Sequence, residues 1–191
     1  MEFDRLRNPQ IKLWAKENLG YVPNIVPLGA PVVADVDRIV VSANMKVGSY
    51  TIAAQPDVPR NITLTHTAVG AADTLGTVTI TGTDRAGQVI TEVLTPSSGA
   101  TVTGSKAFKT VTSVVGAGWV IGEGNDTITV GVGDKIGLPF LMDAATDAPL
   151  SILGTAITVP TATYDVDELC KNTIATSTYD GSKKLYAICL I

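Results

Sequence analysis

The 191-residue chain has few of the residues that usually carry chemistry or bind nucleic acid. Aromatic residues make up 5% of the chain, which leaves few platforms on which bases or sugar rings could stack. The formal net charge is −4, and no basic cluster is larger than Lys183-Lys184. A surface that binds a phosphate backbone needs many lysines and arginines, so we expect no nucleic-acid partner.

Long apolar runs and paired-cysteine motifs are missing as well. No stretch approaches the roughly 20 apolar residues that span a bilayer, so we expect no membrane partner. The opening MEFDRLRNPQ lacks the apolar segment of a signal peptide, which predicts folding in the cytoplasm of the producing cell. Cys170 and Cys189 have no metal-binding spacing, so we expect buried free thiols, with a disulfide between them as the alternative.

The chain instead carries alternating valines, threonines and isoleucines, which indicate an all-β protein. Within Thr77–Thr81, Val78 and Ile80 share one face and the threonines share the other, as in a half-buried strand. A short turn at Asp84–Gly87 leads to a return strand, Gln88–Leu94. Because that strand has apolar residues on both faces, it is predicted to be buried on both sides.

Short strands separated by turn residues continue to the end of the sequence. Their spacing predicts an antiparallel sandwich or barrel, with two small packed β-barrels as the alternative. A turn at Asp180-Gly181 predicts that the last two strands form a C-terminal β-hairpin. The expected strands are Arg38–Val41, Ser49–Ala54, Asn61–Thr67, Gly76–Gly82, Gln88–Leu94, Ala107–Val115, Gly118–Ile121, Thr127–Val132, Lys135–Leu138, Ser151–Val159, Thr173–Thr178 and Lys184–Leu190.

The first 33 residues have a different pattern. Asn8 can cap a helix that begins at Pro9 and ends at Leu19, where Gly20 follows. The next segment, YVPNIVPLGAPVV, is apolar and contains three prolines, which favours an extended arm. We therefore predict a helix and arm over residues 1–33 and a β-domain over residues 34–191.

The arm has two possible roles: it packs across its own domain, or it contacts a neighbouring subunit. In the second case, a chain that begins at Ala34 should still fold. The helix would present one apolar stripe, formed by Ile11, Ala15 and Leu19 with Trp14 beside them. The candidate partner-binding residues of the arm are Ile11, Trp14, Leu19, Tyr21, Val22, Ile25 and Val26.

The only histidine, His66, shares a strand face with Ile62 and Leu64, which predicts a core or edge histidine with a satisfied nitrogen. LTHTA and VGDKIGLP faintly resemble two segments of chymotrypsin-like proteases. However, Lys135 stands where those enzymes have their nucleophile, and such a reaction needs a hydroxyl or thiol beside the imidazole. We therefore expect no enzyme activity.

Two acidic segments are candidates for metal binding. GEGNDTIT matches most of the repeat unit of calcium-binding β-rolls, but one copy cannot build a site that lies between successive repeats, so a turn with Asn125-Asp126 at its corner is expected. Asp165, Asp167 and Glu168 lie near the start of a predicted helical turn, where the helix dipole favours them. We expect neither a metal nor another cofactor.

Three segments carry a resemblance to a known class of proteins. They are QPDVPRNITLTHTAVGAADTLGTVTITGTDRAGQVITEVLT, GSKAFKTVTSV and NDTITVGVGDKIGLPF. Together they resemble the small β-rich virion proteins of tailed bacteriophages, in particular head-associated structural proteins. The resemblance covers about residues 50 to 140.

This resemblance implies a structural protein of the virion, on the capsid surface and made in the host cytoplasm. We expect a capsid decoration or cement protein that binds the major capsid protein and copies of itself, for example as a trimer. The alternatives are a tail or baseplate subunit and, with less support, a glycan-binding adhesin module, since sugar sites favour exposed aromatics.

Overall fold

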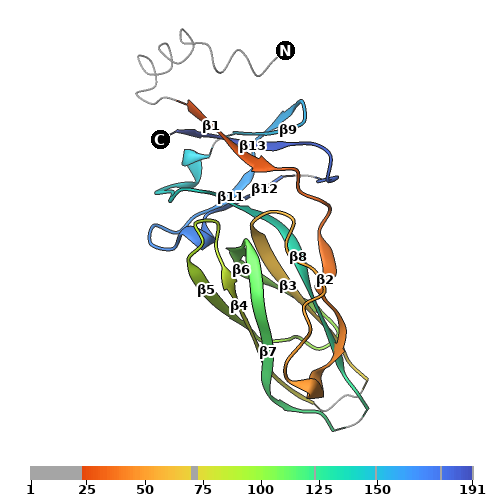
Figure 1. Ribbon diagram of the computed structural model, residues 1–191. Coiled ribbons are helices and arrows are strands. Elements are labelled where there is room, and N and C mark those ends of the chain that lie inside the picture. Colours follow the sequence, from red (N-terminus) through yellow and green to blue (C-terminus); the bar gives the residue numbers. More distant parts are fainter. Residues whose placement is uncertain (1–22, 70–72, 123, 149, 177, 191) are drawn as a thin grey trace.

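The computed structural model describes residues 23–69, 73–122, 124–148, 150–176 and 178–190 (Figure 1). This part of the chain is almost entirely β, and its sheets are antiparallel, which confirms the predicted fold class. Its helical elements are single 3₁₀ turns of three residues each. None of the helices in these ranges has the length and apolar character needed to cross a membrane.

The strands form three sheets, named here A, B and C. Sheet A has the order β1-β13-β9-β10, sheet B has the order β11-β12-β8-β3-β6 with β2 also paired to β8, and sheet C has the order β5-β4-β7. The strands are β1 (Pro23–Gly29), β2 (Asp35–Asn44), β3 (Arg60–Thr67), β4 (Thr74–Thr83), β5 (Val89–Leu94), β6 (Thr101–Phe108), β7 (Thr110–Val120), β8 (Thr127–Gly137), β9 (Leu150–Leu153), β10 (Ala156–Thr158), β11 (Thr161–Thr163), β12 (Thr173–Ala175) and β13 (Leu185–Leu190); the 3₁₀ turns are η1 (Met45–Val47), η2 (Ala145–Asp147) and η3 (Leu169–Lys171).

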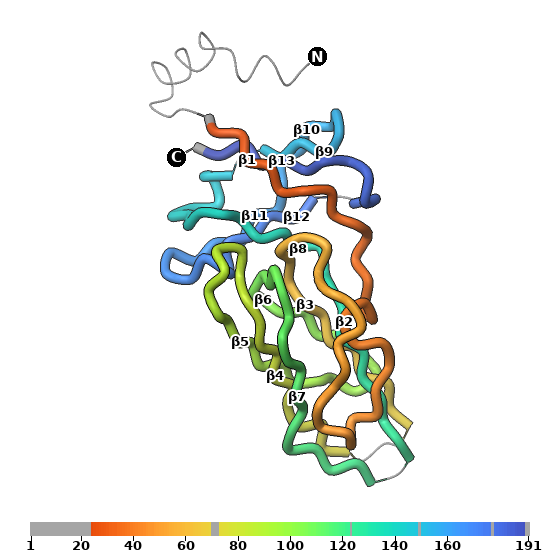
Figure 2. Tube along the Cα trace, viewed as in Figure 1, coloured from red at the N-terminus to blue at the C-terminus, as the bar shows by residue number. Residues whose placement is uncertain are grey.

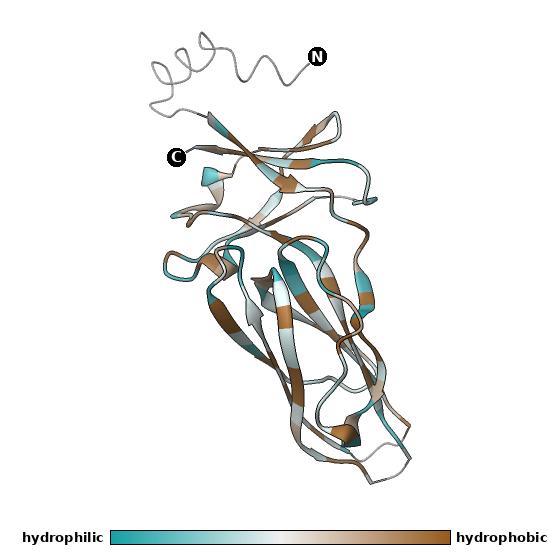
Figure 3. Cartoon of the chain, in the orientation of Figure 1, coloured by the Kyte–Doolittle hydropathy of each residue, from teal (hydrophilic) through white to brown (hydrophobic). Residues whose placement is uncertain are grey.

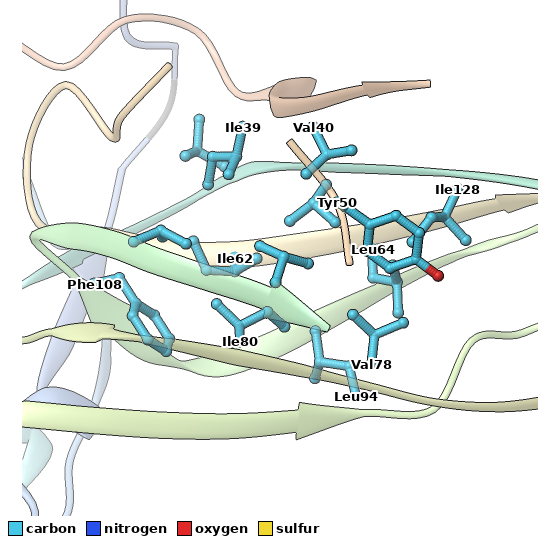
Figure 4. Packing of buried hydrophobic residues seen from close by; sticks show 14 of the residues in the cluster. Ile39, Val40, Tyr50, Ile62, Leu64, Val78, Ile80, Leu94, Phe108 and Ile128 are labelled. Carbon is cyan, nitrogen blue, oxygen red and sulfur yellow. The ribbon is translucent and has the colours of Figure 1, made fainter. Parts of the chain in front are cut away.

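Sheets B and C face each other and enclose the larger of two cores (Figure 4). Val78 and Ile80 of β4 point at Ile62 and Leu64 of β3, and all four side chains are fully buried. The threonines between them on β4 point outward and are half-buried. The alternation predicted for this strand is therefore confirmed, and Figure 3 shows the same apolar–polar alternation along the sandwich strands.

Sheet A lies at one end of the elongated molecule and encloses a second core (Figure 2). The long strand β8 belongs to both cores: Val130 and Val132 pack in the first, and Ile136 packs in the second. The β4–β5 turn also contacts this end, because the Arg85 guanidinium donates to the carbonyls of Gly137 and Pro27, each at 3.0 Å. The sandwich and sheet A are thus joined by a shared strand and by a side-chain clamp.

Two predictions about the strands were wrong. Strand β5 is not buried on both sides: Val89 and Val93 are 76% and 58% exposed, because they lie on the outer face of sheet C, away from the core that Leu94 enters. The last two strands do not form a hairpin, because β12 pairs in sheet B and β13 pairs in sheet A. The turn at Asp180 does form, since its carboxylate accepts two backbone N–H groups, but it connects two different sheets.

Several strand boundaries also differ from the prediction. The two segments expected between Thr127 and Leu138 are one continuous strand, β8, and the segment Ala107–Val115 is divided between β6 and β7. Ser49–Ala54 is extended but forms only one isolated bridge, at Ser49. The helical turn expected near Asp165–Asn172 is present as η3.

The part of the predicted arm that the structure describes is a strand of the protein's own sheet A. Strand β1 pairs with β13 of the same chain, and Val26 and Leu28 lie in the second core. Pro27 fits because β1 is an edge strand, where proline is tolerated, and its carbonyl accepts a hydrogen bond from Arg85. Residues 23–29 therefore pack on their own domain, the first of the two alternatives.

The guanidinium of Arg60 is fully buried where the two cores meet. Its Nε donates to the carbonyl of Gly133 at 2.6 Å, and its Nη1 donates at 3.0 Å both to the carbonyl of Val32 and to the carboxylate of Asp57. The guanidinium carbon also lies 5.8 Å from the centre of the Tyr179 ring, within cation–π range. One side chain thus connects the segment after β1, the loop before β3, strand β8 and the loop before β13.

Replacing this side chain should strongly destabilise the protein. Arg60→Ala leaves the Asp57 carboxylate without its cation and two buried carbonyls without a donor, so we expect a loss of about 3–5 kcal/mol in the free energy of unfolding. Arg38→Ala is the control, because Arg38 makes one exposed hydrogen bond, to the Gln55 carbonyl, and should cost less than about 1 kcal/mol. Urea unfolding measures both values, and equal losses would contradict the assignment.

The effect of an N-terminal truncation on stability should depend on where the chain is cut. A chain that begins at Pro23 keeps β1 and both cores. A chain that begins at Ala34 loses β1, the buried Val26 and Leu28, and the carbonyl of Val32 that accepts from Arg60, so we expect it to be at least about 5 kcal/mol less stable. Urea unfolding and hydrogen exchange of β13 amides compare the two chains. Equal stability would show that β1 contributes little.

Candidate binding surface

His66 is buried near the end of β3, where it pairs with Ile128 of β8, and both of its ring nitrogens have partners. Its Nδ1 accepts the backbone N–H of Gly99 at 3.3 Å, and its Nε2 lies 2.9 Å from the carboxylate of Asp126. Because a backbone N–H can only donate, the proton is assigned to Nε2, which donates to Asp126. The prediction of a core or edge histidine with a satisfied nitrogen is confirmed, and both nitrogens have partners.

Asp126 is the partner that the sequence did not reveal. It was expected at the corner of a turn; its side chain is fully buried, and it also accepts the N–H of Val69 at 2.8 Å. This backbone hydrogen bond, followed by the bond from His66, holds the pKa of Asp126 below 3.8 despite burial. Nothing in the local sequence marks the contact, because Asp126 lies 60 residues from His66.

This pair ties loops together and has no free nitrogen with which to activate a nucleophile. Its backbone contacts extend to η1, since the N–H of Met45 donates to the carbonyl of Asp126 at 3.0 Å. Lys135, which stands at the position of the protease nucleophile, is on β8 near the opposite end of that strand from Ile128, the residue paired with His66. The arrangement therefore supports packing of loops rather than acyl transfer.

The acidic residues near η3 act as caps and ion-pair partners. The Asp165 carboxylate accepts the N–H groups of Asp167 and Glu168 and pairs with Lys171 at 3.2 Å. These contacts lower the pKa of Asp165, the two backbone hydrogen bonds contributing most. In the described part of the chain, no three histidine, cysteine or acidic side chains converge as a metal site.

Both cysteines are free and buried, as predicted. Cys170 lies in η3 and Cys189 lies in β13, and burial raises the pKa of the Cys189 thiol to about 12. A thiol with so high a pKa is a poor nucleophile at neutral pH. The cysteines therefore add packing rather than reactivity.

The candidate arm residues are only partly within the structure. Ile25 is half-buried on β1, and Val26 is buried, so Val26 is not available to a partner in this fold. The role of the others stays a prediction, because they lie outside the described residues; they are Ile11, Trp14, Leu19, Tyr21 and Val22.

The outer face of sheet C is an uncharged surface. The register places Thr79 between Val93 and Val115, and Thr81 between Thr91 and Ser113. Each of these side chains is half-buried or exposed, and none is charged. We call this surface the threonine–valine face; it consists of Thr77, Thr79, Thr81, Thr83, Val89, Thr91, Val93, Ser113, Val115 and Ala117.

One edge of this face is fixed by an inward-pointing carboxylate. Glu92 of β5 is buried, and its Oε1 accepts the N–H of Ser105 at 2.6 Å, the Ser105 hydroxyl at 2.9 Å and the N–H of Lys106 at 3.3 Å. The carboxylate therefore connects β5 to β6, across a gap that no strand pairing closes. Charged residues turned inward are a common way to protect a sheet edge from uncontrolled pairing.

Comparisons with protein-family models, with curated proteins and with solved structures found no match to this chain.

The hydrogen bonds of Asp126 should make the free energy of unfolding depend on pH in the acid range. Because its folded pKa is lowered, Asp126 contributes stability above pH 3.8 that is lost as the pH falls through the lowered value. In Asp126→Asn this contribution disappears, so the stability difference between the two proteins should shrink as the pH falls below 3.8. Urea midpoints across this pH range test the expectation, and a difference that does not change with pH would contradict it.

Proposed function

We propose that this protein is a structural protein of a tailed-phage virion, a capsid decoration or cement protein that binds the major capsid protein and copies of itself. The observation that carries the proposal is the threonine–valine face. The resemblance over residues 50 to 140 supplies the class of partner, and sheet C lies within that range.

The chemistry of the face fits a contact between proteins. The fully buried centre of a protein interface is depleted in charged residues, and this face has none among its ten members. Threonine hydroxyls tolerate water before binding and can accept or donate hydrogen bonds afterwards; those of Thr81 and Thr91 are 3.4 Å apart. The surface therefore suits a partner that is met after folding.

A decoration protein acts by adding many weak contacts to a shell. When copies of the protein associate, each later contact is intramolecular, so the apparent affinity can exceed that of a single site by about 10²–10⁴. A modest affinity of one threonine–valine face is then sufficient. The rigid sandwich below the face keeps its geometry the same in every copy.

The face can be tested by placing charges on it without unfolding the sandwich. Thr79→Lys and Val93→Glu introduce two side chains that face each other across β4 and β5, so the net charge is unchanged. Since both positions are at least partly exposed, stability should change by less than about 1 kcal/mol. Affinity for shells assembled from the major capsid protein of the same phage should fall at least about tenfold, measured by co-sedimentation.

The control variant carries the same charges elsewhere. Val159→Lys with Val166→Glu changes two exposed valines outside the threonine–valine face and should bind as the unmodified protein does. Equal binding by both variants would remove this face from the contact. If the unmodified protein binds no shell and a particle reconstruction places it in the tail, the decoration role is wrong.

A further inference from the structure

Sheet A has a second face that is as apolar as the one it turns toward the core. The cross-strand register forms two rows on this outer face. Ile25, Ile188 and Leu150 make one row, and Pro27, Tyr186, Ile152 and Ile157 make the next. The residues that alternate with them, such as Val26, Ala187 and Leu153, point into the second core.

This face differs in kind from the threonine–valine face. Its members carry aliphatic or aromatic side chains, with no threonine or serine among them. Ile152 and Ile188 at its centre are each only 5% exposed, although neither belongs to either core, whereas Ile157 at the edge is 53% exposed. An apolar face of this kind is unfavourable in water, so it favours a covering segment that completes the burial already seen at Ile152 and Ile188.

The sequence immediately before β1 has the right form for that cover. The predicted helix over residues 9–19 presents Ile11, Ala15 and Leu19 as one stripe with Trp14 beside them, and its opposite side carries Leu13, Lys16 and Glu17. A helix of this length is marginal in water, so it is stable only when its apolar stripe is buried.

The length of chain between the helix and the sheet decides whose sheet it covers. Three residues, 20–22, separate Leu19 from Pro23, and they span at most about 10 Å. An 11-residue helix is about 16 Å long, while a four-stranded sheet is about 14 Å across. The helix can therefore cross the sheet to which it is joined, and its link is too short for it to reach a distant copy.

We propose that the outer face of sheet A is the docking site for residues 9–19 of the same chain, seated as an amphipathic helix. Ile11, Trp14 and Leu19 then contact the protein's own sheet A, in place of the partner contacts expected from the sequence. This inference does not depend on the proposed virion function, because it follows from the composition of the face and the length of the link.

Tryptophan fluorescence and proteolysis can test the docking in the full-length chain. Trp119→Phe leaves Trp14 as the only tryptophan, because the chain has two. In this background we expect blue-shifted Trp14 emission and slow trypsin cleavage after Lys12 and Lys16. Leu19→Asp, on the apolar stripe, should shift the emission to that of exposed tryptophan and accelerate cleavage about tenfold or more.

Two further variants control for unfolding and for non-specific effects. Leu13→Asp makes the same replacement on the opposite side of the helix and should leave emission and cleavage unchanged. Ile25→Asp alters the sheet side of the contact and should release the helix, while circular dichroism confirms that the strands persist. Sedimentation determines whether the protected protein is a monomer.

Each outcome bears directly on the proposal. Protection in a monomer, lost in Leu19→Asp and kept in Leu13→Asp, supports it. The proposal is overturned if Trp14 has exposed emission in the Trp119→Phe background, or if Leu13→Asp and Leu19→Asp behave alike. Protection that appears only in oligomers would overturn it as well, because a second copy would then supply the cover. Normal shell binding by Leu19→Asp would leave the proposed function intact and separate the two proposals.

Discussion

The buried guanidinium of Arg60 is the constraint on which the two-core arrangement depends. A buried charge needs hydrogen-bond partners, and the Nε and Nη1 of Arg60 find theirs in three separate parts of the chain: the segment after β1, the loop before β3 and strand β8. Asp57 has a double role, because its other carboxylate oxygen accepts the N–H of Val32 at 2.7 Å. The Arg60–Asp57 pair therefore fixes where the chain leaves sheet A and where it enters the sandwich.

Other buried polar groups close gaps that the strand ladders leave open. Glu92 joins β5 to β6, His66 with Asp126 joins the loops near the end of β3, and Asn172 accepts the N–H of Met142 at 2.9 Å while donating to two carbonyls near η3. Each group lies where two segments meet without pairing. Hydrophobic burial supplies the bulk of the stability, whereas these contacts select one arrangement of the strands among several of similar burial.

The sequence predicted what depends on local periodicity and missed what depends on distant partners. The alternation on β4 and its turn were predicted because a period of two in side-chain direction is a local property. The prolines of residues 21–33 predicted an arm. Nothing in the local sequence shows that Pro27 lies on an edge strand, because its partner Tyr186 on β13 is 159 residues away along the chain. The same limit hid the exposure of Val89 and Val93, because the covering of a strand's face depends on what packs against the sheet and not on the local sequence.

The two uncharged sheet faces differ in how they can be used. On the threonine–valine face each β4 position places a hydroxyl between valines or other small residues, so water can wet the surface and the face can stay open until a partner arrives. The outer face of sheet A carries isoleucines where the threonine–valine face carries threonines. Left open, it would be prone to non-specific association. The proposed assembly role therefore calls for a cover on sheet A and for none on sheet C. The side-chain chemistry of each face matches that division.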